Sequence, residues 1–167
     1  MARLLCLLLV SRVWAMKCPG SASFIHASAK VVAIADASCH DVHEEVLARV
    51  KSPTWHDPHN GGTYTILSES SSEIELKRLT GNKKYTDKMI LTLAAVEGKC
   101  MIMGCSESQV FSIADGSTNY CNLRNLYCGS AEGCRPVKKD FTSEEAEVNP
   151  SLGAGSDAKA CIKGPQL

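Results

Sequence analysis

The chain has 167 residues, in which 18 Lys and Arg balance 18 Asp and Glu, and it contains nine cysteines. Neutrality without a concentrated basic cluster argues against nucleic acid or an anionic membrane as the main partner, because either partner requires a basic surface. The length fits one small domain behind a leader.

The first residues have the layout of a secretory signal peptide. Arg3 gives a basic start, and the apolar run Leu4–Val10 that follows is too short to span a bilayer. Small residues permit cleavage after Ala15, Ala29 or Ala37. We favour Ala37, because the segment 11–35 contains no acidic residue and little that resembles a folded element.

The domain prediction is therefore a leader at 1–37 and one disulfide-stabilised domain at 38–167, with a loose C-terminal tail from about 142. Secretion is the predicted localisation. The acid-free composition of the leader is also typical of an organelle transit peptide, so delivery to an organelle lumen through a two-part leader stays open. No later apolar run is long enough to cross a membrane, so no span is expected after leader removal.

The elements that follow predict an α+β fold. The valine spacing predicts a helix over 40–51, with Ser38 as its N-cap and Pro53 ending it. Turn residues fill 53–62. Alternating apolar residues then predict short strands at 63–68, 73–79, 88–95, 99–104 and 109–113. About two helical turns are expected near Leu123, between cysteines.

Together these elements indicate an N-terminal helix packed on a four- to five-stranded antiparallel β-meander with a disulfide-rich cap. A barrel-like all-β fold is the alternative.

The cysteines predict a disulfide framework, as in small exported domains that compensate for a limited core with covalent cross-links. Seven of them follow the favoured leader: Cys39, Cys100, Cys105, Cys121, Cys128, Cys134 and Cys161. Spacing does not fix the pairing; we expect Cys39 with Cys161 and the other bonds within 100–134. An odd count leaves one thiol free or available for a disulfide-linked dimer, whereas cleavage after Ala15 keeps Cys18 and gives eight.

Two copies of His-Asp-x-His, at 40–43 and 56–59, make a candidate metal site. The ligands would be His40, His43, His56 and His59, and the metal Zn or Cu, because imidazole suits both ions. The competing interpretation is an exposed helix face followed by an Asp-organised turn. No other cofactor is expected.

Aromatic and amide side chains form a second candidate site. Trp55 and Tyr64, which flank polar turn residues, could form a ligand-binding lip, although a Trp in this position more often covers the edge of a small core. Asn119, Asn122 and Arg124 could similarly contact a ligand from a second loop; otherwise the amides satisfy backbone groups in that loop.

Three segments carry a resemblance to a known group of proteins. They are WHDPHNGGTY at 55–64, KYTDK at 84–88 and STNYCNL at 117–123. With these segments the chain resembles small, secreted, cysteine-rich proteins predicted from genomes of unicellular algae and related protists, over most of the mature length. The resemblance implies export and disulfides and supplies no catalytic residues.

No complete catalytic constellation is present: the nucleophile elbow, the phosphate loop and the Rossmann glycine fingerprint are all missing. We therefore expect an exported, disulfide-stabilised, non-enzymatic binding or interaction module for a small molecule or a protein. A His-rich protein that binds Zn or Cu is the alternative.

Overall fold

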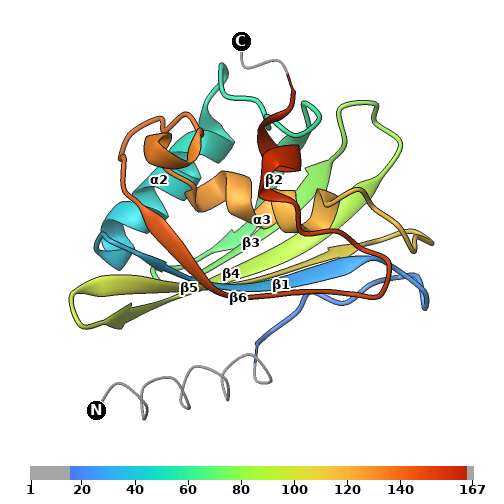
Figure 1. Cartoon of the computed structure of the whole chain (residues 1–167), viewed down its shortest axis with the longest axis horizontal. Coiled ribbons are helices and arrows are strands. Elements are labelled where there is room, and N and C mark those ends of the chain that lie inside the picture. Colours follow the sequence, from blue (N-terminus) through green and yellow to red (C-terminus); the bar gives the residue numbers. More distant parts are fainter. Residues whose placement is uncertain (1–15, 165–167) are drawn as a thin grey trace.

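A computed structural model describes residues 16–164, which form one open antiparallel sheet of six strands (Figure 1). The strands are β1 (Ser28–Ala35), β2 (Thr63–Glu69), β3 (Glu73–Leu79), β4 (Thr86–Val96), β5 (Lys99–Ser108) and β6 (Ser143–Pro150). Their order is β2-β3-β4-β5-β1-β6. The predicted meander is thus present as β2 to β5. Because β2 and β6 form two separate edges, the barrel alternative is wrong.

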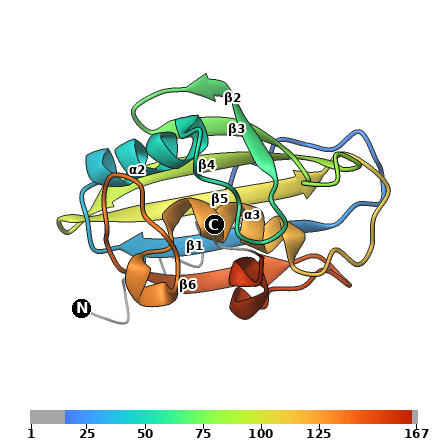
Figure 2. The same cartoon turned by 90° about the horizontal axis from the view of Figure 1, so that it is seen from above.

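Two helices cover one face of the sheet, as both views show (Figures 1 and 2). Helix α2 (Cys39–Lys51) confirms the predicted N-terminal helix; Ser38 caps it by accepting a hydrogen bond from Asp41 N at 3.1 Å. Helix α3 (Thr118–Tyr127) is the short helix expected between cysteines. Between this helical layer and the sheet lies the main apolar core, to which β3, β4 and β5 contribute alternate residues. No helix within residues 16–164 has the length and apolar character needed to cross a bilayer.

Strand β1 corrects the interpretation of the N-terminal region. It pairs with β5 on one side and β6 on the other, and Ala29 and Ala33 are fully buried. The expectation that 11–35 holds little folded structure is therefore wrong. An apolar strand that is paired on both sides has the same composition as the apolar part of a leader. Composition therefore does not distinguish the two, and the strand was assigned to the leader. Cleavage after Ala37 would remove this strand; the run Leu4–Val10 lies outside the described residues.

The C-terminal region is also ordered, contrary to the expectation of a loose tail from about 142. Strand β6 pairs along β1, and the short 3-10 helix η2 (Ala158–Ile162) follows it. Glu145 in β6 accepts hydrogen bonds from Tyr120, Tyr127 and Arg124 of α3, at 2.7, 2.6 and 2.7 Å. A polar-looking strand is therefore fixed to the helical layer by one carboxylate.

The predicted strand at 109–113 is wrong as well. This segment is a loop between β5 and α3, where Phe111 and Ile113 are exposed. Alternation of apolar residues predicted a strand there, but the β4–β5 ladder ends at Ser108, and beyond it the chain makes only single backbone hydrogen bonds such as Gln109 N to Thr86 O.

Four disulfides cross-link the domain: Cys18–Cys105, Cys39–Cys100, Cys121–Cys161 and Cys128–Cys134. The expected Cys39–Cys161 bond is wrong, and of the four only Cys128–Cys134 lies within 100–134. All eight cysteines in residues 16–164 are paired, so this part of the chain offers no thiol for an intermolecular bond. The count is even because Cys18 belongs to the folded domain.

A buried ion pair within α2 anchors the loop before β6. Glu45 and Arg49 are almost completely buried and 2.7 Å apart. The Glu45 carboxylate also accepts the backbone N–H groups of Val137, Lys138 and Lys139. Burial alone would raise the pKa of Glu45, but these N–H donors and Arg49 outweigh it and hold the pKa below its ordinary value.

Removing disulfides one at a time should rank them by the length of chain that each closes. Replacing Cys39 and Cys100, which are 61 residues apart, with alanine should reduce the free energy of unfolding by about 4 kcal/mol. Replacing Cys128 and Cys134, only 6 residues apart, should reduce it by about 2 kcal/mol. Equilibrium denaturation of both double variants measures the difference; a larger loss for the shorter loop would contradict the pairing.

Candidate functional site

The candidate site begins with a row of polar residues on the inner face of the sheet. Arg78 of β3 lies opposite Asp87 of β4, and Asp87 lies opposite Ser108 of β5. All three side chains are buried. Because side chains alternate between faces, Arg78 follows Ile74 and Leu76 onto the face that the helices cover. The inner face is therefore apolar along most of its length and polar where these strands meet the loops.

Helix α3 lays amide side chains over this row. Asn122 Nδ2 donates to Asp87 Oδ2 at 2.9 Å and to Ser106 Oγ at 3.1 Å. Asn119 accepts from Ser106 Oγ at 2.8 Å, and its Nδ2 donates to Ser108 Oγ at 3.1 Å. Both asparagines are fully buried. The predicted ligand residues Asn119 and Asn122 thus hold the helix to the sheet.

Arg78 is the centre of this network. Its guanidinium is fully buried, pairs closely with Asp57 from the α2–β2 loop, and lies 3.7 Å from Asp87. It also donates to Asn60 Oδ1 at 2.5 Å and lies 5.7 Å from the centre of the Tyr64 ring. Burial disfavours the charge, but these neighbours outweigh burial and raise the pKa of Arg78 above its ordinary value. The side chain is therefore a permanent cation shared by two carboxylates.

Gly62 makes room for this cation. A Cβ atom on Gly62 would lie 2.5 Å from the Arg78 Cζ atom, so only glycine lets the backbone approach the guanidinium this closely. On the other side of the cluster, Asn125 Nδ2 donates to Asp57 Oδ1 at 2.6 Å. The turn residues of the 53–62 loop thus surround the Arg78 guanidinium and bury it.

Some buried polar atoms of the cluster can still form hydrogen bonds. Nε and Nη1 of Arg78, and Oδ1 of both Asn122 and Asn125, have no hydrogen-bond partner within residues 16–164. Buried groups of this kind are normally satisfied by ligand or by ordered water.

A cleft of about 470 Å³ opens at the polar end of the sheet. We call it the end cleft. Its polar lining includes Asp87, Ser108, Asp115 and Thr118, and its apolar lining includes Tyr85 and Phe111, which are 50% and 67% exposed. Three connections form its walls: the β3–β4 turn, the β5–α3 loop and Asn60 of the α2–β2 loop. Aromatic rings on the walls and fixed polar groups below are the usual composition of a small-molecule site.

Asp115 extends the hydrogen-bonded floor to the start of α3. Its Oδ2 accepts from the backbone N and the Nδ2 of Asn119, at 3.0 and 2.9 Å, and its Oδ1 accepts from Ser117 N at 3.0 Å. Hydrogen bonds therefore run continuously from Asp87 through Ser108 and Asn119 to Asp115.

Trp55 and Tyr64 lie apart from the end cleft. Their rings are in contact, with centres 5.8 Å apart, and both pack against the main core. Trp55 borders a separate hollow of about 490 Å³ with His56, Pro136 and Val137. The Tyr64 hydroxyl donates to the Asn122 carbonyl oxygen at 3.1 Å, and burial followed by the nearby Asp57 raises its pKa well above the ordinary value. Tyr64 is thus a structural donor, and the two predicted lip residues do not share a cleft with Asn119 or Arg124.

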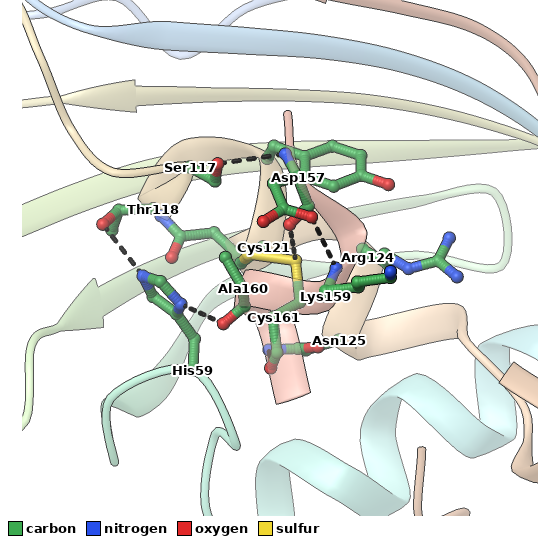
Figure 3. Close-up of a disulfide and its surroundings, with 12 residues drawn as sticks. His59, Ser117, Thr118, Cys121, Arg124, Asn125, Asp157, Lys159, Ala160 and Cys161 are labelled. Carbon is green, nitrogen blue, oxygen red and sulfur yellow. Dashed lines mark hydrogen bonds between the residues drawn. A yellow bond between two sulfur atoms is a disulfide. The ribbon is translucent and has the colours of Figure 1, made fainter. Parts of the chain in front are cut away.

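The four candidate histidines lie in three places, and one of them, His56, borders the Trp55 hollow described above. His40 and His43 line a shallow hollow with Glu69, and the buried His43 Nε2 has no partner within residues 16–164. His59 instead lies beside the Cys121–Cys161 disulfide, with Nδ1 2.8 Å from the Ala160 oxygen and Nε2 3.2 Å from Thr118 Oγ1 (Figure 3).

In the described part of the chain, the one group of three potential metal ligands is Cys18, Cys105 and Glu107, and both sulfurs there are in a disulfide. The fold does not bring the four histidines together. Of the predicted metal ligands, His40 and His43 line the same hollow. Comparisons with protein-family models, with curated proteins and with solved structures give no significant match.

Sequence reasoning missed Arg78, Asp87 and Ser108, although a signal was present. The alternation in EIELKRL that placed Ile74 and Leu76 inward also places Arg78 inward, and a buried arginine requires acidic partners. Which carboxylates it meets depends on strand register and on the path of the 53–62 loop, and no local pattern gives either.

Replacing Arg78 with leucine should leave Asp57 and Asp87 buried without their cation. We expect the free energy of unfolding to fall by about 3–5 kcal/mol, as for other buried ion pairs that lose one partner. Lys77→Leu, at the neighbouring exposed position of the same strand, should change it by less than about 0.5 kcal/mol. Chemical denaturation measures both, and equal losses would show that the ion pair has no special role.

Proposed function

We propose that this protein is an exported, disulfide-stabilised binding domain that takes a small, neutral, hydroxyl-rich ligand of the sugar class in the end cleft. The observation that carries the proposal is the composition of the cleft. Carboxylate, amide and hydroxyl groups line it, and Tyr85 and Phe111 stand exposed on its walls.

The chemistry of these groups favours hydroxyl donors over charged ligands. Carboxylate oxygens of Asp87 and Asp115 already accept protein hydrogen bonds, which fixes their positions while leaving acceptor capacity for a ligand hydroxyl. Arg78 offsets part of the negative charge beneath the cleft, so a strongly cationic ligand is not required. The C–H faces of a sugar ring are apolar and can pack on Tyr85 and Phe111.

Binding is favoured over catalysis because the ionisable groups of the site are engaged in holding the fold. Asp57 and Asp87 pair with Arg78, and the ring nitrogens of His59 lie within hydrogen-bond distance of Thr118 and Ala160. A general acid or base needs a proton that it can give or take at the substrate. These groups instead hold the fold, and Asp87 is the one among them that lines the end cleft.

Titration with simple sugars tests the proposal. Glucose, galactose, mannose and xylose are added in turn to the isotope-labelled protein, and we expect backbone NMR shifts at 80–87 and 108–118 with at least one of them. Phe111→Ala should weaken the best binding about threefold to tenfold through loss of ring contact. Leu67→Ala, an exposed apolar position on β2, is the matched control. Shifts with none of the sugars would overturn the ligand class, and shifts confined to the Trp55 hollow would overturn the site.

Export is part of the same proposal, and it requires a different cleavage site. We propose cleavage after Ala15, because the fold uses both β1 and Cys18. The four disulfides support an oxidising compartment, which the secretory route and an organelle lumen both provide.

Mass spectrometry of the native, unreduced protein tests the processing. We expect a mature N-terminus at Met16 and no cysteine open to alkylation before reduction. A mature chain that starts at Ser38 would contradict the proposed cut, and free thiols throughout would contradict the compartment.

A further inference from the structure

Three loops meet at the end of the sheet that holds the end cleft (right-hand end of Figures 1 and 2). They are residues 20–27 before β1, 109–117 after β5 and 151–156 after β6. Hydrogen bonds join them: Ala27 N donates to Ser112 Oγ at 2.9 Å, and Ser28 N donates to Ser151 Oγ at 2.9 Å. The loops are therefore fixed relative to one another.

Large apolar side chains stand exposed on these loops. Phe24 and Leu152 are 101% and 96% exposed. We call the full set the loop-tip patch; it consists of Phe24, Ile25, Phe111, Ile113 and Leu152. With Tyr85, it accounts for six of the eight large apolar side chains exposed in residues 16–164. Such clustering on one end marks an interaction surface.

Charge is missing from the stretches of these loops that carry the patch. The stretches GSASFIHA at 20–27, QVFSIA at 109–114 and PSLGAGS at 150–156 contain no Lys, Arg, Asp or Glu, in a chain that is 22% charged. The nearest acids have internal partners: Asp115 accepts N–H groups at the start of α3, and Glu107 accepts Gly20 N at 2.6 Å. Moving these tips into an apolar environment would therefore desolvate few charges.

Two lysines lie beside the patch. Lys83 and Lys84 are in the β3–β4 turn next to Tyr85, and that turn shares the end cleft with Phe111. Both lysines are exposed, and neither forms an ion pair within residues 16–164. An uncharged apolar tip with unpaired cations at its margin complements a phospholipid surface, where phosphate groups border hydrocarbon.

We propose that the loop-tip patch docks this domain reversibly on the surface of a phospholipid bilayer. Phe24 and Leu152 would enter the interface, and Lys83 and Lys84 would face lipid phosphates. The tips protrude singly from separate loops and carry no charged residue to specify a protein partner's register. A lipid surface needs no such register, so it is the occupant that these features favour.

Sedimentation with phosphatidylcholine vesicles tests this inference. The wild-type protein should sediment with the vesicles, and Phe24→Ser/Leu152→Ser should partition at least about tenfold more weakly. Leu67→Ser/Val137→Ser removes two exposed apolar side chains outside the patch and should leave partitioning unchanged. On vesicles that also contain anionic phosphatidylserine, Lys83→Gln/Lys84→Gln should weaken binding in a salt-dependent way, and by less than the Phe24/Leu152 change.

The outcomes separate this inference from the proposed function. Phe24 and Leu152 do not line the end cleft, so their variants should keep any sugar-induced NMR shifts. Equal partitioning of the Phe24/Leu152 and Leu67/Val137 variants would overturn the inference. So would a failure to bind vesicles together with concentration-dependent self-association that the Phe24/Leu152 variant abolishes, because the patch would then be a protein interface.

Discussion

The ion pair between Arg78 and Asp57 is the constraint on which the rest of this structure depends. Asp57 belongs to a loop without regular structure, and Arg78 to the inner face of β3, so their contact fixes where the chain crosses from helix α2 back to the sheet. A buried cation without a partner is strongly unfavourable, which makes alternative paths for this loop costly. The surrounding residues extend the effect, because Asp57 also holds Asn125 of α3.

Disulfides and polar contacts both hold the helices to the rest of the domain, in different ways. Cys39–Cys100 fastens α2 to β5, and Cys121–Cys161 fastens α3 to η2. Hydrogen bonds then set the position of each helix more finely, through Glu45 for α2 and through Glu145 and the asparagines for α3. Cross-links of this kind restrict the unfolded chain, whereas buried polar networks penalise wrong packing. A small domain with a polar layer in its core benefits from both.

Local patterns in the sequence predicted the individual helices and strands better than they predicted which of these elements lie side by side. Helix 40–51 and the four strands of the meander follow from spacing, alternation and turn residues, and all five are present. The strand at 28–35 was hidden because an apolar strand inside a sheet and the apolar part of a leader have the same composition. Disulfide pairing failed for another reason: it depends on which strands adjoin, and β1 enters the sheet between β5 and β6 from far away in sequence.

The candidate site shows the same limit more sharply. Asn119 and Asn122 were singled out, but as ligand contacts, since no sequence pattern reveals that they lie over the polar row. Arg124 likewise turned out to bind Glu145 of a strand that was expected to be loose. The contacts of side chains that were chosen for their chemistry thus depend on partners distant in sequence.

The polar layer also explains why a cleft is present at this end of the sheet. Apolar side chains interdigitate and fill the space between helix and sheet, as they do around Leu123, which lies directly against Gly104. At the polar end, each group must instead keep a hydrogen-bonding geometry, and a cleft is left beside the buried Asp87 and Ser108. The floor is held in place by the protein itself, so the ligand that we propose would lose little free energy to ordering the protein. Burying Arg78 and its carboxylates is unfavourable in itself, but the same contacts hold the polar groups of the cleft in fixed positions.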